Sequence, residues 1–279
     1  MTTAAASYDS MGQVLAHLVR DWADEGHAIR ASLYDWCRQR TAGRRRILVP
    51  GAGLGRLAWE LQQQQEEEFS NCGARQGDPC IVHAVEMSWT MVAVFHAMVG
   101  QVPHKWTLYP YLNDFWTDQV TSETRFQPVR IPNVAIPTIT TTTTVTSSSR
   151  LTWTVADFVA LSQLPSEQAS YDAIVTCFFL DTATNILDYL HAMERVLQRK
   201  GRWINVGPLH WHANARLVLT AEDLYAVFQA ASQWKILEWS VDDTPLEYRS
   251  VTNNNPQGGG TTSTRYEAYR PLRFVVEKQ

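Results

Sequence analysis

The stretch Arg46-Ile-Leu-Val-Pro-Gly-Ala-Gly-Leu-Gly-Arg-Leu-Ala-Trp-Glu60 decides the fold of this chain. An apolar run over residues 47–49 leads into three glycines at alternate positions, Gly51, Gly53 and Gly55, and an amphipathic segment follows. This order predicts a strand, a tight turn and a helix. Glycine lets the backbone approach a ligand closely, and a helix N-terminus aims its N–H groups at that ligand. The stretch therefore predicts a nucleotide-like cofactor at the first crossover of an α/β sheet.

The spacing of the glycines distinguishes between cofactors. Dinucleotide sites use G-x-G-x-x-G, but here the third glycine comes one residue early and Arg56 stands at the position that this pattern needs. G-x-G-x-G is instead common among methyltransferases that use S-adenosylmethionine (SAM). A nicotinamide dehydrogenase is therefore disfavoured. The plain alternative is a glycine turn that only joins a strand to a helix, and Val49 stands where many methyltransferases have an acidic residue.

Composition excludes several classes of protein. The 279 residues suffice for one large domain, and a net charge of −4 argues against a nucleic-acid binder that works by bulk charge. Cys37, Cys72, Cys80 and Cys177 form no C-x-x-C pair, so we expect no zinc site and no other metal. Residues 1–10 lack a signal-peptide pattern, and residues 87–100 are too short and too polar to span a membrane. We expect a cytoplasmic protein, with the nucleus as a further location.

Alternating strand and helix patterns predict a doubly wound sheet. Residues 11–40 read as helices divided at Gly26, and residues 62–68 as a solvated end of the helix after the glycines. We expect an N-terminal helical segment over residues 1–45 and a methyltransferase domain over 46–279, with a flexible Thr/Ser-rich insertion near 138–150. Residues 104–137 read as irregular. Strands are predicted at 80–85, 151–155, 171–178, 202–206, 234–241 and 266–276, the last antiparallel, and helices at 89–99, 185–197 and 222–231.

Several polar residues and glycines follow predicted strands. Ligands of doubly wound sheets bind beyond the carboxyl ends of the strands. Gly51, Glu86, Asp157, Asp181 and Gly207 all fall there. An acidic residue that closes the second strand accepts hydrogen bonds from ribose hydroxyls in this class of fold. We therefore interpret Glu86 as a ribose ligand, the alternative being a surface glutamate at a strand end.

Longer phrases are more specific than the glycines alone. They are Val19-Arg-Asp-Trp22, Ile47–Trp59, Asp157-Phe158, Thr176-Cys-Phe-Phe-Leu-Asp-Thr-Ala183 with Asn185, and Trp203-Ile-Asn-Val-Gly-Pro-Leu209. In these phrases, which spread over nearly the whole chain, the sequence resembles the carnosine N-methyltransferase family. The resemblance implies a Rossmann-like class I methyltransferase that moves a methyl group from SAM to a histidine imidazole of carnosine, giving anserine and S-adenosylhomocysteine.

The resemblance also implies roles for single residues. It places Asp181 and His212 at the reaction, with His212 completing the pocket for the imidazole. The implied cofactor contacts are Arg20, Gly51, Gly53, Gly55, Arg56, Glu86, Asp157, Phe158 and Cys177. The implied substrate contacts are Phe178, Asp181, His212, Tyr266 and Tyr269. The partner is then a small His-containing dipeptide or peptide, without nucleic acid or membrane, and members of the family can form homodimers.

The carboxylate of Asp181 also suits this chemistry, apart from any resemblance. An imidazole nitrogen attacks only with a free lone pair, and a carboxylate bonded to the other nitrogen sets the tautomer and stabilises the growing positive charge. The alternatives are that Asp181 caps the helix after Asn185 and that His212 is a packed or surface histidine. For the whole chain, the alternatives are a methyltransferase acting on histidine in a larger peptide or protein, and a non-catalytic SAM-binding scaffold.

Overall fold

The computed structural model describes residues 11–71, 80–112, 118–137, 149–248, 263–264 and 266–279. The chain forms two compact units. Unit 1 comprises Met1–Ser32, Ser88–Thr142 and Leu246–Tyr269, and unit 2 comprises Leu33–Met87, Thr143–Pro245 and Arg270–Gln279. The predicted insertion near 138–150 lies mostly outside the described residues, and the predicted boundary between residues 45 and 46 stays a prediction.

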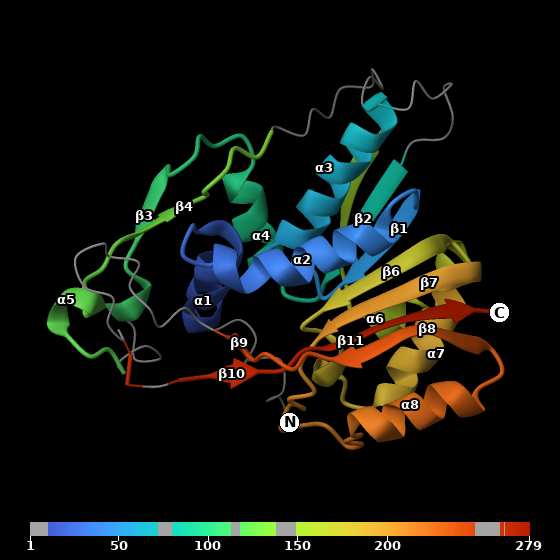
Figure 1. Cartoon of the computed structure of the whole chain (residues 1–279). Coiled ribbons are helices and arrows are strands. Elements are labelled where there is room, and N and C mark those ends of the chain that lie inside the picture. Colours follow the sequence, from blue (N-terminus) through green and yellow to red (C-terminus); the bar gives the residue numbers. More distant parts are fainter. Residues whose placement is uncertain (1–10, 72–79, 113–117, 138–148, 249–262, 265) are drawn as a thin grey trace, which may run out of the picture. The chain divides into compact units, whose positions relative to one another are not determined.

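Unit 2 contains a mostly parallel sheet. Among the described residues, its seven strands run in the order β5-β2-β1-β6-β7-β11-β8 (Figure 1). The strand β11 pairs antiparallel with both β7 and β8, whereas the other pairs are parallel. The strands are β1 (Arg46–Pro50), β2 (Cys80–Glu86), β5 (Ser149–Val155), β6 (Tyr171–Cys177), β7 (Leu197–Gly207), β8 (Trp234–Val241) and β11 (Leu272–Lys278). This confirms the predicted doubly wound sheet with an antiparallel last strand.

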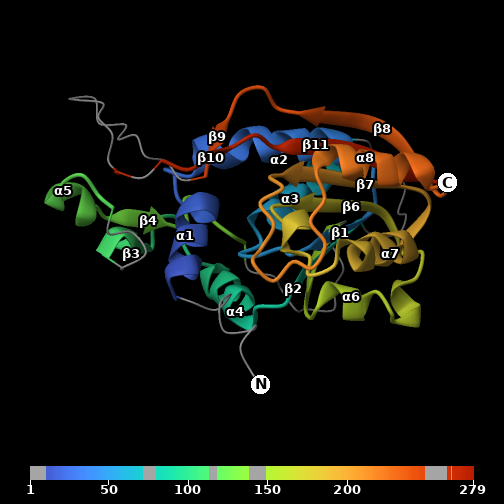
Figure 2. The ribbon, with the colours of Figure 1, turned by 90° about the horizontal axis from the view of Figure 1, so that it is seen from below.

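Helices cover both faces of this sheet because its central strands are apolar on both faces. On one face Leu48, Ile174 and Trp203 join a buried core with Leu190 and Phe228 of the covering helices. Figure 1 shows α6, α7 and α8 together, apart from α2 and α3, and Figure 2 shows the same elements from below. The helices of unit 2 are α3 (Arg56–Asn71), α6 (Phe158–Leu161), α7 (Ile186–Val196), α8 (Ala221–Ala230), the 3-10 turns η4 (Pro165–Glu167) and η5 (Leu180–Thr182), and the second part of α2 (His27–Thr41).

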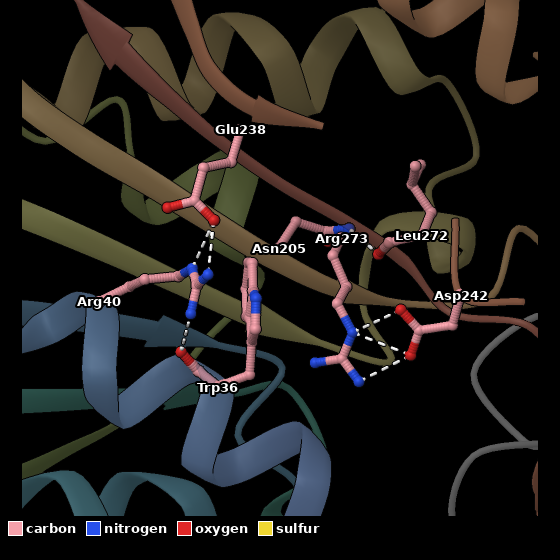
Figure 3. Close-up of polar contacts among 7 residues, drawn as sticks. All are labelled: Trp36, Arg40, Asn205, Glu238, Asp242, Leu272 and Arg273. Atoms are coloured by element: carbon pink, nitrogen blue, oxygen red, sulfur yellow. Dashed lines mark hydrogen bonds and ion pairs between the residues drawn. The ribbon is translucent and has the colours of Figure 1, made fainter. Parts of the chain in front are cut away.

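A stack of side chains attaches α2 to the far edge of the sheet (Figure 3). The indole of Trp36 has the guanidinium of Arg40 at 4.1 Å from its ring centre and that of Arg273 at 5.5 Å. Arg40 pairs with Glu238 of β8, and Arg273 pairs with Asp242, which directly follows β8. The stack therefore joins one helix to two neighbouring strands through aromatic, cationic and anionic contacts.

Unit 1 combines helices with two short strand pairs. The break between α1 and α2 lies at Gly26, where a Cβ atom would come within 2.1 Å of the carbonyl oxygen of Arg20. This confirms the predicted division of the N-terminal helices. Besides the first part of α2, the elements are α1 (Met11–Trp22), α4 (Trp89–Met98), β3 (Trp106–Leu108), η2 (Pro110–Leu112), α5 (Ser122–Arg125), β4 (Val129–Ile131), β9 (Leu246–Glu247) and β10 (Ala268–Tyr269). Within the described residues, no helix is both long and apolar enough to cross a membrane.

Three local expectations were wrong. The run 62–68 is not a solvated helix end, because α3 continues through it and buries Gln65, which donates to the carbonyl of Arg44. The region 104–137 is not wholly irregular, because β3 and β4 pair antiparallel. The strand predicted at 266–276 is divided into β10 and β11, since Pro271 between them has no N–H to donate to a ladder.

Candidate active site

The glycine turn after β1 depends on backbone conformations that other residues rarely adopt. Gly51, Gly53 and Gly55 have φ angles of 63°, 55° and 75°. The N–H of Ala52 donates to the carbonyl of Val85 at 3.1 Å, which holds the turn against the end of β2. The turn thus presents backbone groups at the carboxyl end of the sheet, where ligands of such folds bind.

Glu86 closes β2 and is connected to this turn. Its Oε2 accepts a hydrogen bond of 2.8 Å from the N–H of Gly53. That bond fixes the position of the carboxylate, a group that can accept about four hydrogen bonds in total. The geometry suits a partner with two neighbouring hydroxyls.

The ring of Phe179 supports the glycine turn. A Cβ atom built on Gly51 would lie 2.2 Å from Cδ2 of Phe179, so the ring occupies the space that a side chain would need. Phe158 packs against the same ring with centroids 6.0 Å apart, and Tyr189 of α7 stacks on it at 4.7 Å with an interplanar angle of 11°. An aromatic cluster therefore lies directly under the turn.

Asp157 and Phe158 follow β5, next to Glu86. The N–H of Ala156 donates to the carbonyl of Glu86 at 3.0 Å. Asp157 caps α6 by accepting a bond of 2.8 Å from the N–H of Ala160, and Phe158 is buried. The structure thus brings these two residues to the same end of the sheet as the glycine turn.

Arg56 begins α3, and its side chain is engaged within that helix. Its Nε donates to Oε1 of Glu60 at 2.6 Å, and its guanidinium lies 5.2 Å from the ring centre of Trp59. The predicted cofactor contact of Arg56 stays a prediction, and this geometry favours a contact through its backbone N–H.

The segment after β6 leaves the sheet abruptly. Cys177 ends β6 as a partly buried thiol, and Phe178 has a φ angle of 55°. The N–H of Phe178 donates to the carbonyl of Val206 at 3.2 Å, and a Cβ atom on Gly207 would lie 3.0 Å from that nitrogen. Gly207 therefore lets the chain at Phe178 approach closely.

Asp181 lies in the next turn, η5, and is buried with 5% of its surface exposed. Its Oδ2 accepts a bond of 2.9 Å from the N–H of His210. Burial raises the pKa of Asp181 to about 6, with the His210 bond acting in the opposite direction. The alternative that Asp181 caps α7 is wrong, because Asn185 is the N-cap and accepts from the N–H of Leu187.

His212 is attached to the same turn by its backbone. Its N–H donates to the carbonyl of Asp181 at 3.1 Å, and the N–H of Arg216 donates to the carbonyl of Thr184 at 2.7 Å. Burial, followed by the charge of His210, lowers the pKa of the half-buried His212. The histidine is therefore held neutral near pH 7 beside a carboxylate-bearing turn.

Three of the residues predicted for the site lie in unit 1. Arg20 pairs with Asp21 through bonds of 2.7 and 3.1 Å. Burial alone would raise the pKa of Asp21, but Arg20 outweighs it and the pKa is lowered. Tyr269 belongs to β10, with its ring 6.3 Å from that of Tyr248, and Tyr266 is exposed. Their roles in the site stay predictions.

Some site residues were missed from the sequence. His210 acts through its backbone N–H, which leaves no signal in residue type. Phe179, Thr182 and Tyr189 surround the turn that carries Asp181. Phe179 and Thr182 stand inside the phrase that carries the family resemblance, whereas Tyr189, like His210, lacked any marker. In the parts of the chain that the structure describes, no group of three or more His, Cys, Asp or Glu residues is arranged to hold a metal ion.

Comparison with known proteins gives a consistent result. The family model for carnosine N-methyltransferase matches residues 1–255. Carnosine N-methyltransferase of Mus musculus is 30% identical over 224 residues, covering 76% of this chain and 50% of the mouse protein. That of Schizosaccharomyces pombe is 29% identical over 215 residues, covering 71% of this chain and 52% of the yeast protein. The chain thus spans about half the length of these curated relatives.

Among solved structures, magnesium protoporphyrin IX methyltransferase of Synechocystis PCC 6803 with bound SAM is similar to this chain with a TM-score of 0.49. The sequence identity is 14%, and the alignment covers 98% of this chain and 94% of that protein.

Proposed function

This chain belongs to the carnosine N-methyltransferase family, and we propose that it transfers a methyl group from SAM to the histidine imidazole of carnosine or a related His-containing dipeptide. The observation that carries this proposal is the buried carboxylate of Asp181, which accepts a hydrogen bond from the N–H of His210. Asp181 stands two residues after Phe179, whose ring supports the glycine turn. A buried carboxylate at this point can hold an imidazole close to a cofactor on the turn.

The residues present fit SAM. The turn offers backbone N–H groups, and the carboxylate of Glu86, fixed by Gly53, suits the two hydroxyls of a ribose. Phe158 provides an apolar wall beside Glu86 for a flat base. When bound, SAM supplies an electrophilic methyl group on a sulfonium. This fit supports the family's cofactor.

Asp181 prepares the nucleophile. At neutral pH it is ionised, because its pKa of about 6 lies below the solution pH. It accepts the N–H of the substrate imidazole, which leaves the lone pair of the other ring nitrogen free to attack. With SAM bound, methyl transfer would leave the substrate ring positively charged, and the carboxylate of Asp181 would stabilise that charge.

His212 is proposed to complete the pocket as a neutral group. Its lowered pKa keeps it from competing as a second cation with the positive ring. It can accept or donate a hydrogen bond to the dipeptide, and its backbone bond to Asp181 keeps the two residues in fixed register. Arg20, Tyr266 and Tyr269 are proposed, on the family resemblance alone, to contact cofactor and dipeptide.

The test is mass-spectrometric detection of methyl transfer from SAM to carnosine. We expect methylated carnosine from the wild type and a loss of at least about 100-fold in kcat/KM for Asp181→Ala, in the range seen for groups that handle a proton. Asp188→Ala serves as the matched control, because Asp188 is an exposed aspartate in the first turn of α7. Equal activity of Asp181→Ala and wild type would contradict the assigned role. SAM binding without product would reject carnosine and direct the search to histidine in longer peptides or proteins.

A further inference from the structure

The turn that carries Asp181 is held by a hydrogen-bonded chain of side chains. Oγ1 of Thr182 donates to the carbonyl of Phe179 at 2.7 Å and lies 3.0 Å from the hydroxyl of Tyr189. Because the single proton of Thr182 is used on that carbonyl, Tyr189 is the donor in the second bond. The hydroxyl of Tyr189 therefore donates to Thr182, and the hydroxyl of Thr182 donates to the carbonyl of Phe179.

Tyr189 also contacts the support of the cofactor turn. Its ring stacks on that of Phe179, and the ring of Phe179 fills the space beside Gly51. One residue of α7 thus contacts the aromatic support of the glycine turn through its ring and the turn of Asp181 through its hydroxyl.

We propose that Thr182 and Tyr189 are positioning residues that fix the carboxylate of Asp181 relative to the glycine turn, and so set the alignment of methyl donor and acceptor. The proposal rests on the proposed function. In-line displacement depends steeply on alignment, since a misplacement of about 1 Å can cost about 100-fold in rate. Neither residue is assigned any contact with substrate.

The four amides of this region report the position of the turn. Thr182 and Ala183 donate within η5, to the carbonyls of Phe179 and Leu180, and the amides of His210 and His212 donate to Asp181. If the hydroxyl chain holds η5, its removal must weaken all four bonds together. The amides of β1 and β6 belong to the sheet and must not change.

The experiment compares Thr182→Val, which replaces the hydroxyl by a methyl group of similar size, with Thr182→Ser, which keeps it. Tyr189→Phe removes the other hydroxyl and retains the ring stack. We expect Thr182→Val and Tyr189→Phe to lower kcat for carnosine about tenfold, with the KM for SAM within about twofold and the melting temperature nearly unchanged. Thr182→Ser must recover at least half of the wild-type kcat. The double variant must be no worse than Thr182→Val alone, because both changes break the same chain.

Hydrogen exchange separates this proposal from the proposed function. In Thr182→Val, exchange is expected to rise in peptides covering residues 179–184 and 209–213, and to stay at the wild-type rate in those of β1 and β6. This readout needs no turnover. If the wild type fails to methylate carnosine, the proposed function fails while exchange still decides whether the chain holds the turn. The proposal would be overturned by any of three results: exchange at the wild-type rate in Thr182→Val, a kcat in Thr182→Ser as low as in Thr182→Val, or a fall in kcat that follows the fall in melting temperature.

Discussion

At the scale of the residue, Asp181 combines burial with ionisation. Its 5% exposure deprives the carboxylate of water, and the backbone N–H groups of His210 and of Asp181 itself compensate only in part, so the pKa rises to about 6. A carboxylate in such a place is useful only if another donor completes its environment. The imidazole N–H of the proposed substrate would be that donor, which makes the free enzyme less stable than its complex.

The free-energy cost of burying an ionised carboxylate predicts how Asp181→Asn changes the pH dependence of stability. The folded-state pKa of about 6 exceeds the ordinary value of 3.8, so the folded protein binds more protons between these values. The stability that Asp181 contributes is therefore complete below pH about 4 and is lost as the pH rises through about 6. Two pKa units correspond to roughly 3 kcal/mol. We expect Asp181→Asn to reduce the fall in unfolding free energy between pH 4.5 and 7.5 by about 2 kcal/mol.

Urea unfolding at the two pH values measures this difference. Asp188→Asn is the control for the effect of burial, because it makes the same change at an exposed aspartate. The same pH dependence in wild type and Asp181→Asn would show that the carboxylate is not penalised by its surroundings.

At the scale of the element, the glycine turn allows a matched comparison. Gly51 and Gly43 both have positive φ angles, 63° and 73°, but a Cβ atom at Gly51 would meet Phe179 while one at Gly43 would meet nothing within 4 Å. Gly43→Ala should cost only the backbone term, about 1–2 kcal/mol. Gly51→Ala should cost a further 1–3 kcal/mol, roughly, for overpacking against the ring, and should weaken SAM binding. If chemical denaturation gives equal losses of unfolding free energy for Gly43→Ala and Gly51→Ala, the ring of Phe179 moves aside at little cost.

The strands could be predicted from sequence wherever their apolar runs were bounded by glycine or polar residues. The runs at β1, β2 and β6 are of this kind, because both faces of a parallel strand are buried. Helix α7 was also placed well, since Asn185 marks its start. The hydrophilic run in α3 was misjudged because Gln64 donates to Glu68 and to the carbonyl of Arg38, and Gln65 donates to the carbonyl of Arg44, which composition does not reveal.

The sequence predicts candidate residues for the site but not the contacts that support them. Glu86 ends β2 and Asp181 follows β6, and their positions come from topology. The contact of Phe179 with Gly51 joins residues far apart in sequence, and the bond of Tyr189 to Thr182 depends on the pose of α7. A single sequence carries no record of such pairings.

At the scale of the whole molecule, the glycine turn, Glu86, Asp157 and Asp181 all belong to unit 2. A ligand that binds only folded protein adds RT ln(1 + [L]/Kd) to stability, about 2.7 kcal/mol at 100 times Kd. For a unit of this size, that corresponds to a rise of roughly 5–10 °C in melting temperature. We expect SAM and S-adenosylhomocysteine each to raise the transition of unit 2 by this amount in calorimetry.

The same experiment discriminates between cofactors, with NAD as the contrasting ligand and Glu86→Gln as the contrasting variant. NAD should give no shift, because the spacing of the three glycines differs from that of a dinucleotide turn. Glu86→Gln keeps an acceptor for the N–H of Gly53 but loses the charge that strengthens bonds to ribose hydroxyls, so the shift with SAM should shrink while the unliganded transition stays near its wild-type temperature. If NAD raises the melting temperature as much as SAM does, the glycine turn is of the dinucleotide-binding kind. If the shift with SAM is as large in Glu86→Gln as in the wild type, Glu86 does not contact the cofactor.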